Sequence, residues 1–101
     1  MKKIINGKMY DTDTAEYMLG YVSDSGDLAY TKEDLYRKKN GEYFIVGEGG
    51  PKSKYRIVRY EGCYYSGGPN VIPISESQAK EFVEIHGVAE EYERIFGKVE
   101  E

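Results

Sequence analysis

The sequence predicts an α+β protein: a small antiparallel β-meander followed by two carboxy-terminal α-helices packed on one face of the sheet. Two observations support this prediction. Apolar and aromatic runs flank Asn-Gly pairs at residues 6–7 and 40–41, and Asn-Gly is the strongest short-range hairpin signal because both residues tolerate a positive φ. After residue 74 the apolar residues recur at helical spacing instead.

The size and composition predict a single domain over residues 1–101, mainly β over 1–74 and helical over 75–101. A hydrophobic fraction of 40% and a net charge of -4 are typical of a folded soluble chain. Cys63 is the single cysteine, which excludes an internal disulfide and fits a reducing compartment. No apolar run approaches the roughly eighteen residues of a membrane span, and the first residues lack the apolar core of a signal peptide. We therefore expect a cytoplasmic protein without membrane contact.

The first quarter of the chain predicts a hairpin and an ambiguous segment. Residues 2–11 form the hairpin, with Asn6-Gly7 as its turn. Residues 15–22 fit a helix capped by Asp11 to Thr14, or a strand. Their aromatic and β-branched end, with Gly20 inside, favours the strand.

The central hairpin runs from Leu35 to Val46, preceded by a loop at 23–27 and a lead-in at 28–34. Two registers are open. A two-residue turn pairs Arg37 with Phe44, whereas a three-residue loop with a bulge at Gly41 pairs Tyr36 with Phe44. The second register makes the better aromatic cross-strand pair.

The next segments predict short strands separated by glycine-rich breaks. We expect a sharp turn at 47–51, a strand at 55–60, a turn at 61–62, a strand at 63–65 and a break at 67–70. Residues 71–74 form a short edge strand, since Pro73 cannot donate to a ladder. The oligomeric state is open, and a dimer through this exposed edge is one alternative.

The last quarter predicts two helices. Ser75 and Gln78 have the spacing of a capping box, and residues 79, 82, 83 and 86 form one apolar face that ends at Gly87. The second helix is expected to direct five apolar residues inward and three glutamates outward: Val88, Tyr92, Ile95, Phe96 and Val99, and Glu90, Glu91 and Glu93.

The charge is unevenly distributed along the chain. Residues 75–101 hold three basic and eight acidic residues. Residues 32–59, here called the basic ribbon, hold eight basic and four acidic residues. Because Lys and Arg neutralise phosphates and tyrosine rings stack on bases, the ribbon is the candidate surface for a partner or a nucleic acid; the alternative is a hairpin kept soluble by edge lysines. Its candidate binding residues are Arg37, Lys38, Lys39, Tyr43, Lys52, Lys54, Tyr55, Arg56 and Arg59.

Signals for catalysis are sparse, so we expect no catalytic residue, no metal and no cofactor. Residues 47–50 lack the following Gly-Lys-Ser/Thr and helix of a phosphate-binding loop. Cys63 and His86 are each the only residue of their type, and no metal-ligand spacing surrounds them. A small nuclease using converging carboxylates stays open as an alternative.

Several segments together resemble a family of small proteins carried by phages, plasmids and integrative elements of Firmicutes. They are Met1 to Lys8, Tyr10 to Thr12, Leu35 to Lys39, Gly47 to Gly50, Ser53 to Tyr55, Ile72 to Ile74 and Glu91 to Gly97. Some proteins that look like this are associated with anti-CRISPR activity against type II-A systems. The resemblance implies a stoichiometric inhibitor that binds Cas9 or its guide-RNA complex in the bacterial host cell. A nucleic-acid-binding accessory protein of a mobile element, contacting RNA or DNA through the ribbon, is the alternative.

Overall fold

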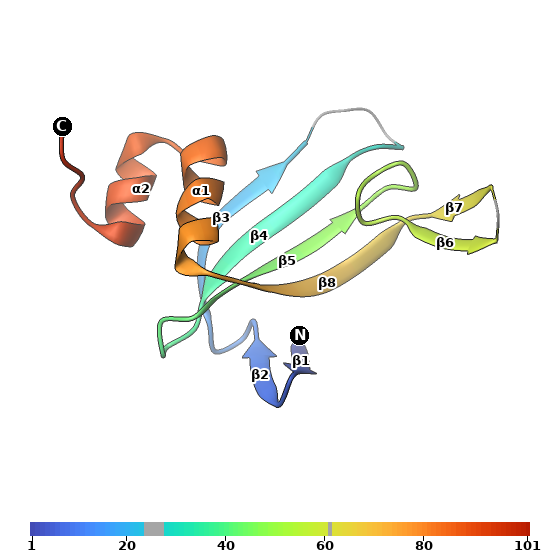
Figure 1. Cartoon of the computed structure of the whole chain (residues 1–101), viewed down its shortest axis with the longest axis horizontal. Helices are drawn as coiled ribbons and strands as arrows, with labels where there is room; N and C mark the ends of the chain where they lie inside the picture. Colours follow the sequence, from blue (N-terminus) through green and yellow to red (C-terminus); the bar gives the residue numbers. More distant parts are fainter. Residues whose placement is uncertain (24–27, 61) are drawn as a thin grey trace.

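The computed structural model describes residues 1–23, 28–60 and 62–101. Residues 24–27 of the expected loop at 23–27 and residue 61 of the expected turn at 61–62 lie outside them. The described residues form an α+β fold of antiparallel strands and two carboxy-terminal helices, as predicted (Figure 1). The elements are β1 (Lys2–Ile5), β2 (Lys8–Asp11), β3 (Glu16–Val22), β4 (Thr31–Arg37), β5 (Tyr43–Gly49), β6 (Ile57–Tyr60), β7 (Cys63–Tyr65), β8 (Gly67–Ile74), α1 (Glu76–His86) and α2 (Ala89–Phe96).

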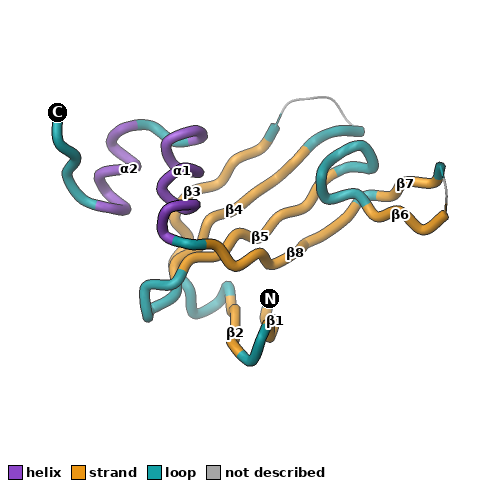
Figure 2. Tube along the Cα trace, in the orientation of Figure 1, coloured by secondary structure: helices purple, strands orange, loops and turns teal. Residues whose placement is uncertain are grey.

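The main sheet has the order β3-β4-β5-β8, with each neighbouring pair antiparallel. The chain leaves this sheet after β5, forms the separate β6–β7 hairpin, and returns as the edge strand β8. Figure 2 shows the consequence: the β6–β7 hairpin projects from one end of the sheet, and the helices lie at the other. The longest extent of the molecule is 48 Å.

The core on the helix-bearing face joins the sheet to both helices. Leu35 is fully buried and Val83 of α1 is 1% exposed. The buried members of this core are Met18, Leu19, Leu35, Tyr43, Ile45, Ala79, Phe82, Val83 and Ile95. Burial of such side chains contributes about 1.5–3 kcal/mol each, so this cluster accounts for much of the stability of the sheet–helix unit.

The β1–β2 hairpin covers part of the opposite face of the sheet. Its turn is at Asn6-Gly7, with φ of 51° and 76°, as the sequence predicts. Tyr10 packs edge-on against the fully buried Phe44, with ring centroids 5.4 Å apart. The ring of Phe44 also stacks on Tyr36 at 5.3 Å. A second, smaller core therefore holds this hairpin to the sheet.

The central hairpin adopts the register with a three-residue loop. Tyr36 pairs with Phe44, and the Lys38 N–H donates to the Glu42 carbonyl oxygen at 2.7 Å. Gly41 has a φ of 92°, which a residue with a Cβ adopts only with strain. The stacked aromatic pair across β4 and β5 gives this register its advantage.

The ambiguous segment at 15–22 is a strand, which confirms the favoured interpretation: β3 spans Glu16–Val22. The Asp11 carboxylate accepts a hydrogen bond from the Asp13 N–H at 2.9 Å, so it closes a turn rather than capping a helix. A bulge between Tyr17 and Leu19 interrupts the pairing with β4. It places Met18 and its neighbour Leu19 in the buried core together.

Three predicted boundaries in the middle of the chain are wrong. β5 continues through residues 47–49, so the expected turn begins only at Gly50. Residues 67–70 form the first half of β8 rather than a break. β6 starts at Ile57, two residues later than expected, because Tyr55 is buried at the base of the hairpin. The glycine-rich segments at 47–49 and 67–70 were predicted to be a turn and a break. In the structure they lie in strands, and neighbouring groups come close to the glycines.

The helices begin as predicted, but not every residue that was expected on their apolar faces is buried. Ser75 and Gln78 form the capping box of α1. Tyr92, Ile95 and Phe96 of α2 pack on the core. Val88 and Val99, which were expected to point inward, are 59% and 57% exposed because they lie just outside α2. Among the described residues, no helix is long and apolar enough to cross a membrane.

Candidate nucleic-acid interface

The structure separates the nine candidate residues into two groups. The turn group (Arg37, Lys38, Lys39 and Tyr43) lies where β4 and β5 are joined. The arm group (Lys52, Lys54, Tyr55, Arg56 and Arg59) lies between the end of β5 and the end of β6. These are opposite ends of the sheet (Figure 1), since the seven residues of β5 extend over about 20 Å. The basic ribbon is therefore not one continuous surface.

In the turn group, the side chains of Arg37 and Lys38 form contacts within the protein. Arg37 Nη1 donates to the Ile95 carbonyl oxygen at 3.0 Å, and its Nη2 lies 3.4 Å from a Glu16 carboxylate oxygen. Lys38 Nζ lies 3.2 Å from a Glu42 carboxylate oxygen and 3.7 Å from the centroid of the Tyr10 ring. These side chains fasten α2 and the β1–β2 hairpin to the sheet.

Of the other two residues of the turn group, Tyr43 lies in the core and Lys39 is exposed to solvent. Tyr43 is 7% exposed and packs against Phe96, so its ring is not a surface for a partner. Glu42 accepts hydrogen bonds from Lys8, Asn40 and Lys38, which lower its pKa to about 2. Lys39 is exposed and, within residues 1–23, 28–60 and 62–101, its side chain has no hydrogen bond or ion pair.

The arm group starts from a buried polar cluster that anchors the segment after β5. Tyr55 Oη donates to the Glu33 carboxylate at 2.5 Å, and Lys54 Nζ lies 2.9 Å from the same carboxylate. Burial and then the adjacent Glu33 raise the pKa of Tyr55. The Tyr55 ring lies directly on Gly47, where a Cβ would come within 2.2 Å of it. Tyr55 and Lys54 thus have a structural role.

A tight turn then directs the chain away from the sheet. Ser53 Oγ donates to the Gly50 carbonyl oxygen at 2.7 Å and accepts from the Tyr55 N–H at 3.2 Å. Arg56 Nη1 donates to the Ser53 carbonyl oxygen at 3.2 Å. This turn and the Tyr55 cluster together set the direction in which β6 leaves the body of the protein.

The β6–β7 hairpin and the preceding Arg56, here together called the arm, present apolar and aromatic side chains to solvent. Ile57 pairs with Tyr65, and Val58 with Tyr64. Their exposed fractions are 40%, 45%, 56% and 50% in that order. A two-stranded hairpin is only marginally stable alone, so an exposed arm of this composition gains stability when a partner covers it.

Two exposed cations, Arg56 and Arg59, belong to the arm. The Arg56 guanidinium is 5.5 Å from the centroid of the Tyr64 ring. Arg59 is exposed and falls at the register shift between Val58 and residue 60. Guanidinium groups contact phosphates, and aromatic rings stack on unpaired bases. The arm therefore combines the two chemistries that single-stranded nucleic acids require.

Sequence reasoning missed four residues of this surface: Ile57, Val58, Tyr64 and Tyr65. They were assigned to strands, and strand residues of this type are usually buried. The available signal was the length of the strands, because strands of four and three residues cannot cover both faces of one another.

The other chemical signals are not brought together. Cys63 is exposed on the arm, while His86 stacks on Tyr21 at the helical end, with ring centroids 3.8 Å apart. Residues 47–49 are in β5 rather than in a phosphate-binding loop. Among the described residues no group of three or more His, Cys, Asp or Glu side chains could hold a metal ion.

Comparison of the chain with protein-family models, with curated proteins and with solved structures gives no match.

Proposed function

We propose that the protein is a non-catalytic binding protein of a mobile genetic element, and that it inhibits type II-A Cas9 in the cytoplasm of a bacterial host. The partner is taken from the resemblance of the sequence to mobile-element proteins. The mode of action is taken from one observation: a projecting arm that exposes Arg56, Arg59 and Tyr64 without a core beneath them.

The arm has the residue types that dominate protein interfaces. Tyrosine and arginine are enriched among the residues whose loss costs most binding energy. Tyr64 and Tyr65 are about half exposed, at 50% and 45%. A complex of Cas9 with its guide RNA offers both phosphates and protein surface, so it can contact the arginines and the apolar side chains of the arm at once.

The test is a DNA-cleavage assay with Cas9 and guide RNA, titrated with the purified protein. Inhibition should be complete near a one-to-one ratio. Arg59→Ala and Tyr64→Ala should each raise the concentration needed, by about thirtyfold for a hot-spot residue. Lys39→Ala is the matched comparison for Arg59→Ala, since it removes an exposed cation at the other end of the sheet. Unimpaired cleavage at a large molar excess would refute the proposal. If only Lys39→Ala abolished inhibition, the binding site would lie in the turn group instead.

A second candidate function is direct binding of RNA or single-stranded DNA, as an accessory protein of a mobile element. The observation that favours it is the Arg56 guanidinium held against the exposed Tyr64 ring. Binding should weaken with added salt, and loss of one phosphate contact should reduce the slope of log affinity against log salt by about 0.7 for a single strand. A mobility-shift titration at low salt with Arg56→Ala and Arg59→Ala tests this. Absence of any retardation at low salt removes this candidate.

The same cleavage reactions test the nuclease alternative. Guide RNA incubated with the protein and Mg²⁺ alone should remain intact if the protein acts by binding. A cut that requires the metal and persists through purification would replace the binding proposal with an enzymatic one.

A further inference from the structure

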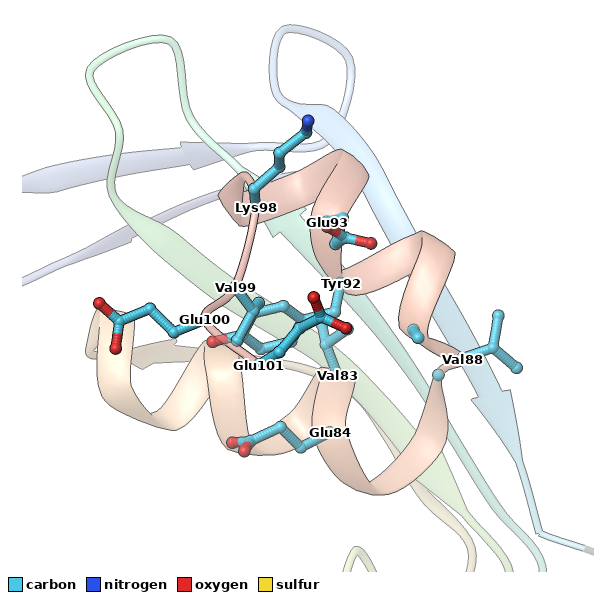
Figure 3. A pocket seen from close by; sticks show the side chains of 11 residues that line it. Val83, Glu84, Val88, Tyr92, Glu93, Lys98, Val99, Glu100 and Glu101 are labelled. Atoms are coloured by element: carbon cyan, nitrogen blue, oxygen red, sulfur yellow. The ribbon is translucent and has the colours of Figure 1, made fainter.

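A groove lies at the helical end of the molecule, between α1, α2 and the chain that follows α2. Its volume is about 650 Å³. Val83 of α1 and Tyr92 of α2 line it, together with Val88 just before α2, Ala89 at its start and Val99 after its end. Figure 3 shows Val99 and Tyr92 over Val83, with Val88 at one side of the group.

The apolar lining is left open to solvent. Val88 is 59% exposed and Val99 57% exposed, whereas Val83 beneath them is 1% exposed. Tyr92 and Phe96 are partly buried and pack against the core. The groove thus has an apolar floor continuous with the core, and its walls end in solvent.

The rim of the groove is acidic. Glu84, Glu93, Glu100 and Glu101 line it. In the part of the chain that the structure describes, none of these four carboxylates has an ion pair within 4.0 Å. Lys98 also lines the groove, but its amino group is directed away from Glu100 and Glu101 in Figure 3. Four carboxylates and one ammonium group therefore give the lining of the groove a net negative charge.

We propose that this groove binds a basic amphipathic α-helix of a partner protein. A helix placed there would set its apolar stripe on Val88, Tyr92 and Val99 and its flanking lysines or arginines against the four carboxylates. This is the mode in which a groove between helices receives a further helix. The charge complementarity excludes nucleic acid at this site, since phosphates would face the carboxylates.

The proposed helix site is separate from the arm and does not depend on it. The two lie at opposite ends of the 48 Å axis, as Figure 1 shows. Proteins that bind nucleic acids carry basic helices on their surfaces, so the groove and the arm would suit different parts of one ribonucleoprotein. The groove proposal holds even where the arm has no function.

The test measures binding of the full chain to a fluorescent peptide of leucine and lysine, about fourteen residues long, with the leucines on one helical face. A scrambled peptide of the same composition is the ligand control. Fluorescence anisotropy should show at least tenfold tighter binding to the amphipathic peptide than to the scrambled peptide. Removing one rim charge should weaken binding by about fivefold, since a charge pair at 4 Å in water contributes about 1 kcal/mol.

Matched variants locate the site. Glu93→Gln and Glu90→Gln each remove one exposed carboxylate from α2, but only Glu93 lines the groove. Glu93→Gln should weaken peptide binding and Glu90→Gln should not, while Val99→Ser should weaken it without a change in net charge. Equal binding of the scrambled peptide, equal effects of the two Gln variants, or no binding at low salt would each overturn the proposal. Self-association that Glu93→Gln abolishes, without peptide binding, would also overturn it and assign the groove to a second copy.

Discussion

The turn group and the arm have nearly the same residue types, but the fold uses them differently. At the turn, Arg37 and Lys38 contact Ile95, Glu16, Glu42 and Tyr10, and Tyr43 is part of the core. On the arm, Arg59 and the tyrosines of β7 are exposed. The difference arises because two hairpins and a helix converge on the turn, whereas the arm has only its own two strands.

The comparison shows that a basic, tyrosine-rich composition does not by itself mark a binding surface. Where a core lies beneath them, long cationic side chains bury their stems and pair with nearby carboxylates and carbonyls. Where no core lies beneath them, the same residues remain available to a partner. The following predictions test whether the two ends differ in this way.

The largest expected difference is in stability. Phe44→Ala removes a fully buried ring that Tyr10 and Tyr36 contact, so it should lower the free energy of unfolding by about 3–5 kcal/mol. Tyr64→Ala on the arm should change it by less than about 0.5 kcal/mol. Urea denaturation followed by circular dichroism measures both. A loss of several kcal/mol on Tyr64→Ala would mean that the arm is part of the cooperative fold.

The base of the arm should show an intermediate effect. Tyr55→Phe keeps the ring on Gly47 but removes the hydrogen bond to the buried Glu33. Because the acceptor is charged, the free energy of unfolding should fall by about 1.5–3 kcal/mol. Tyr65→Phe on the exposed part of the arm is the matched control and should be nearly neutral. In Tyr55→Phe, the rate of amide hydrogen exchange should increase most in residues 53–58. An equal increase across the whole chain would contradict an anchoring role for Tyr55.

A smaller effect is expected from the two adjacent lysines of the turn. The Lys38 side chain is 14% exposed and contacts both Glu42 and the Tyr10 ring. Lys38→Ala should therefore destabilise the protein by about 1 kcal/mol. Urea denaturation of both variants measures this, and Lys39→Ala should be neutral. Equal effects would show that the pairing of Lys38 does not contribute to folding.

The sequence was sufficient to predict those elements that a few neighbouring residues specify. Asn6-Gly7, Asn40-Gly41 and the Ser75–Gln78 capping box each specify a turn or a helix start within a few residues, and the structure has all three. For the central hairpin the sequence left two registers open, and the structure adopts the one that pairs Tyr36 with Phe44.

The candidate sites depend on contacts between distant parts of the chain, which the sequence does not show. Tyr55 was predicted to be a surface residue because nothing nearby indicates that Glu33, twenty-two residues away, accepts its hydroxyl. Arg37 is engaged by Ile95, fifty-eight residues away. Val99 was assigned to an apolar helical face, but the helix ends at Phe96, so its side chain lines an open groove instead.

The smallest effect should appear as a pH dependence at the turn. Hydrogen bonds from Lys8, Asn40 and Lys38 lower the pKa of Glu42 to about 2, from an ordinary value of 4.5. A carboxyl whose pKa is lower in the folded state contributes stability above its unfolded pKa and loses it as the pH falls through its folded pKa. This contribution is therefore complete above pH 4.5 and is lost between pH 4.5 and about 2.

Glu42→Gln removes the titrating group and should flatten this part of the stability profile. The difference in urea midpoint between the native chain and Glu42→Gln should be constant above pH 4.5 and shrink toward pH 2. Glu81→Gln, which removes an exposed carboxylate of α1, is the control and should not reproduce this shrinkage. Lys8 joins β2 to Glu42 at 2.7 Å, so signals from the β1–β2 hairpin should change first as the pH falls. A midpoint difference that stays constant down to pH 2 would mean that folding does not lower the pKa of Glu42, and the contacts of this carboxylate would then not distinguish the turn from the arm.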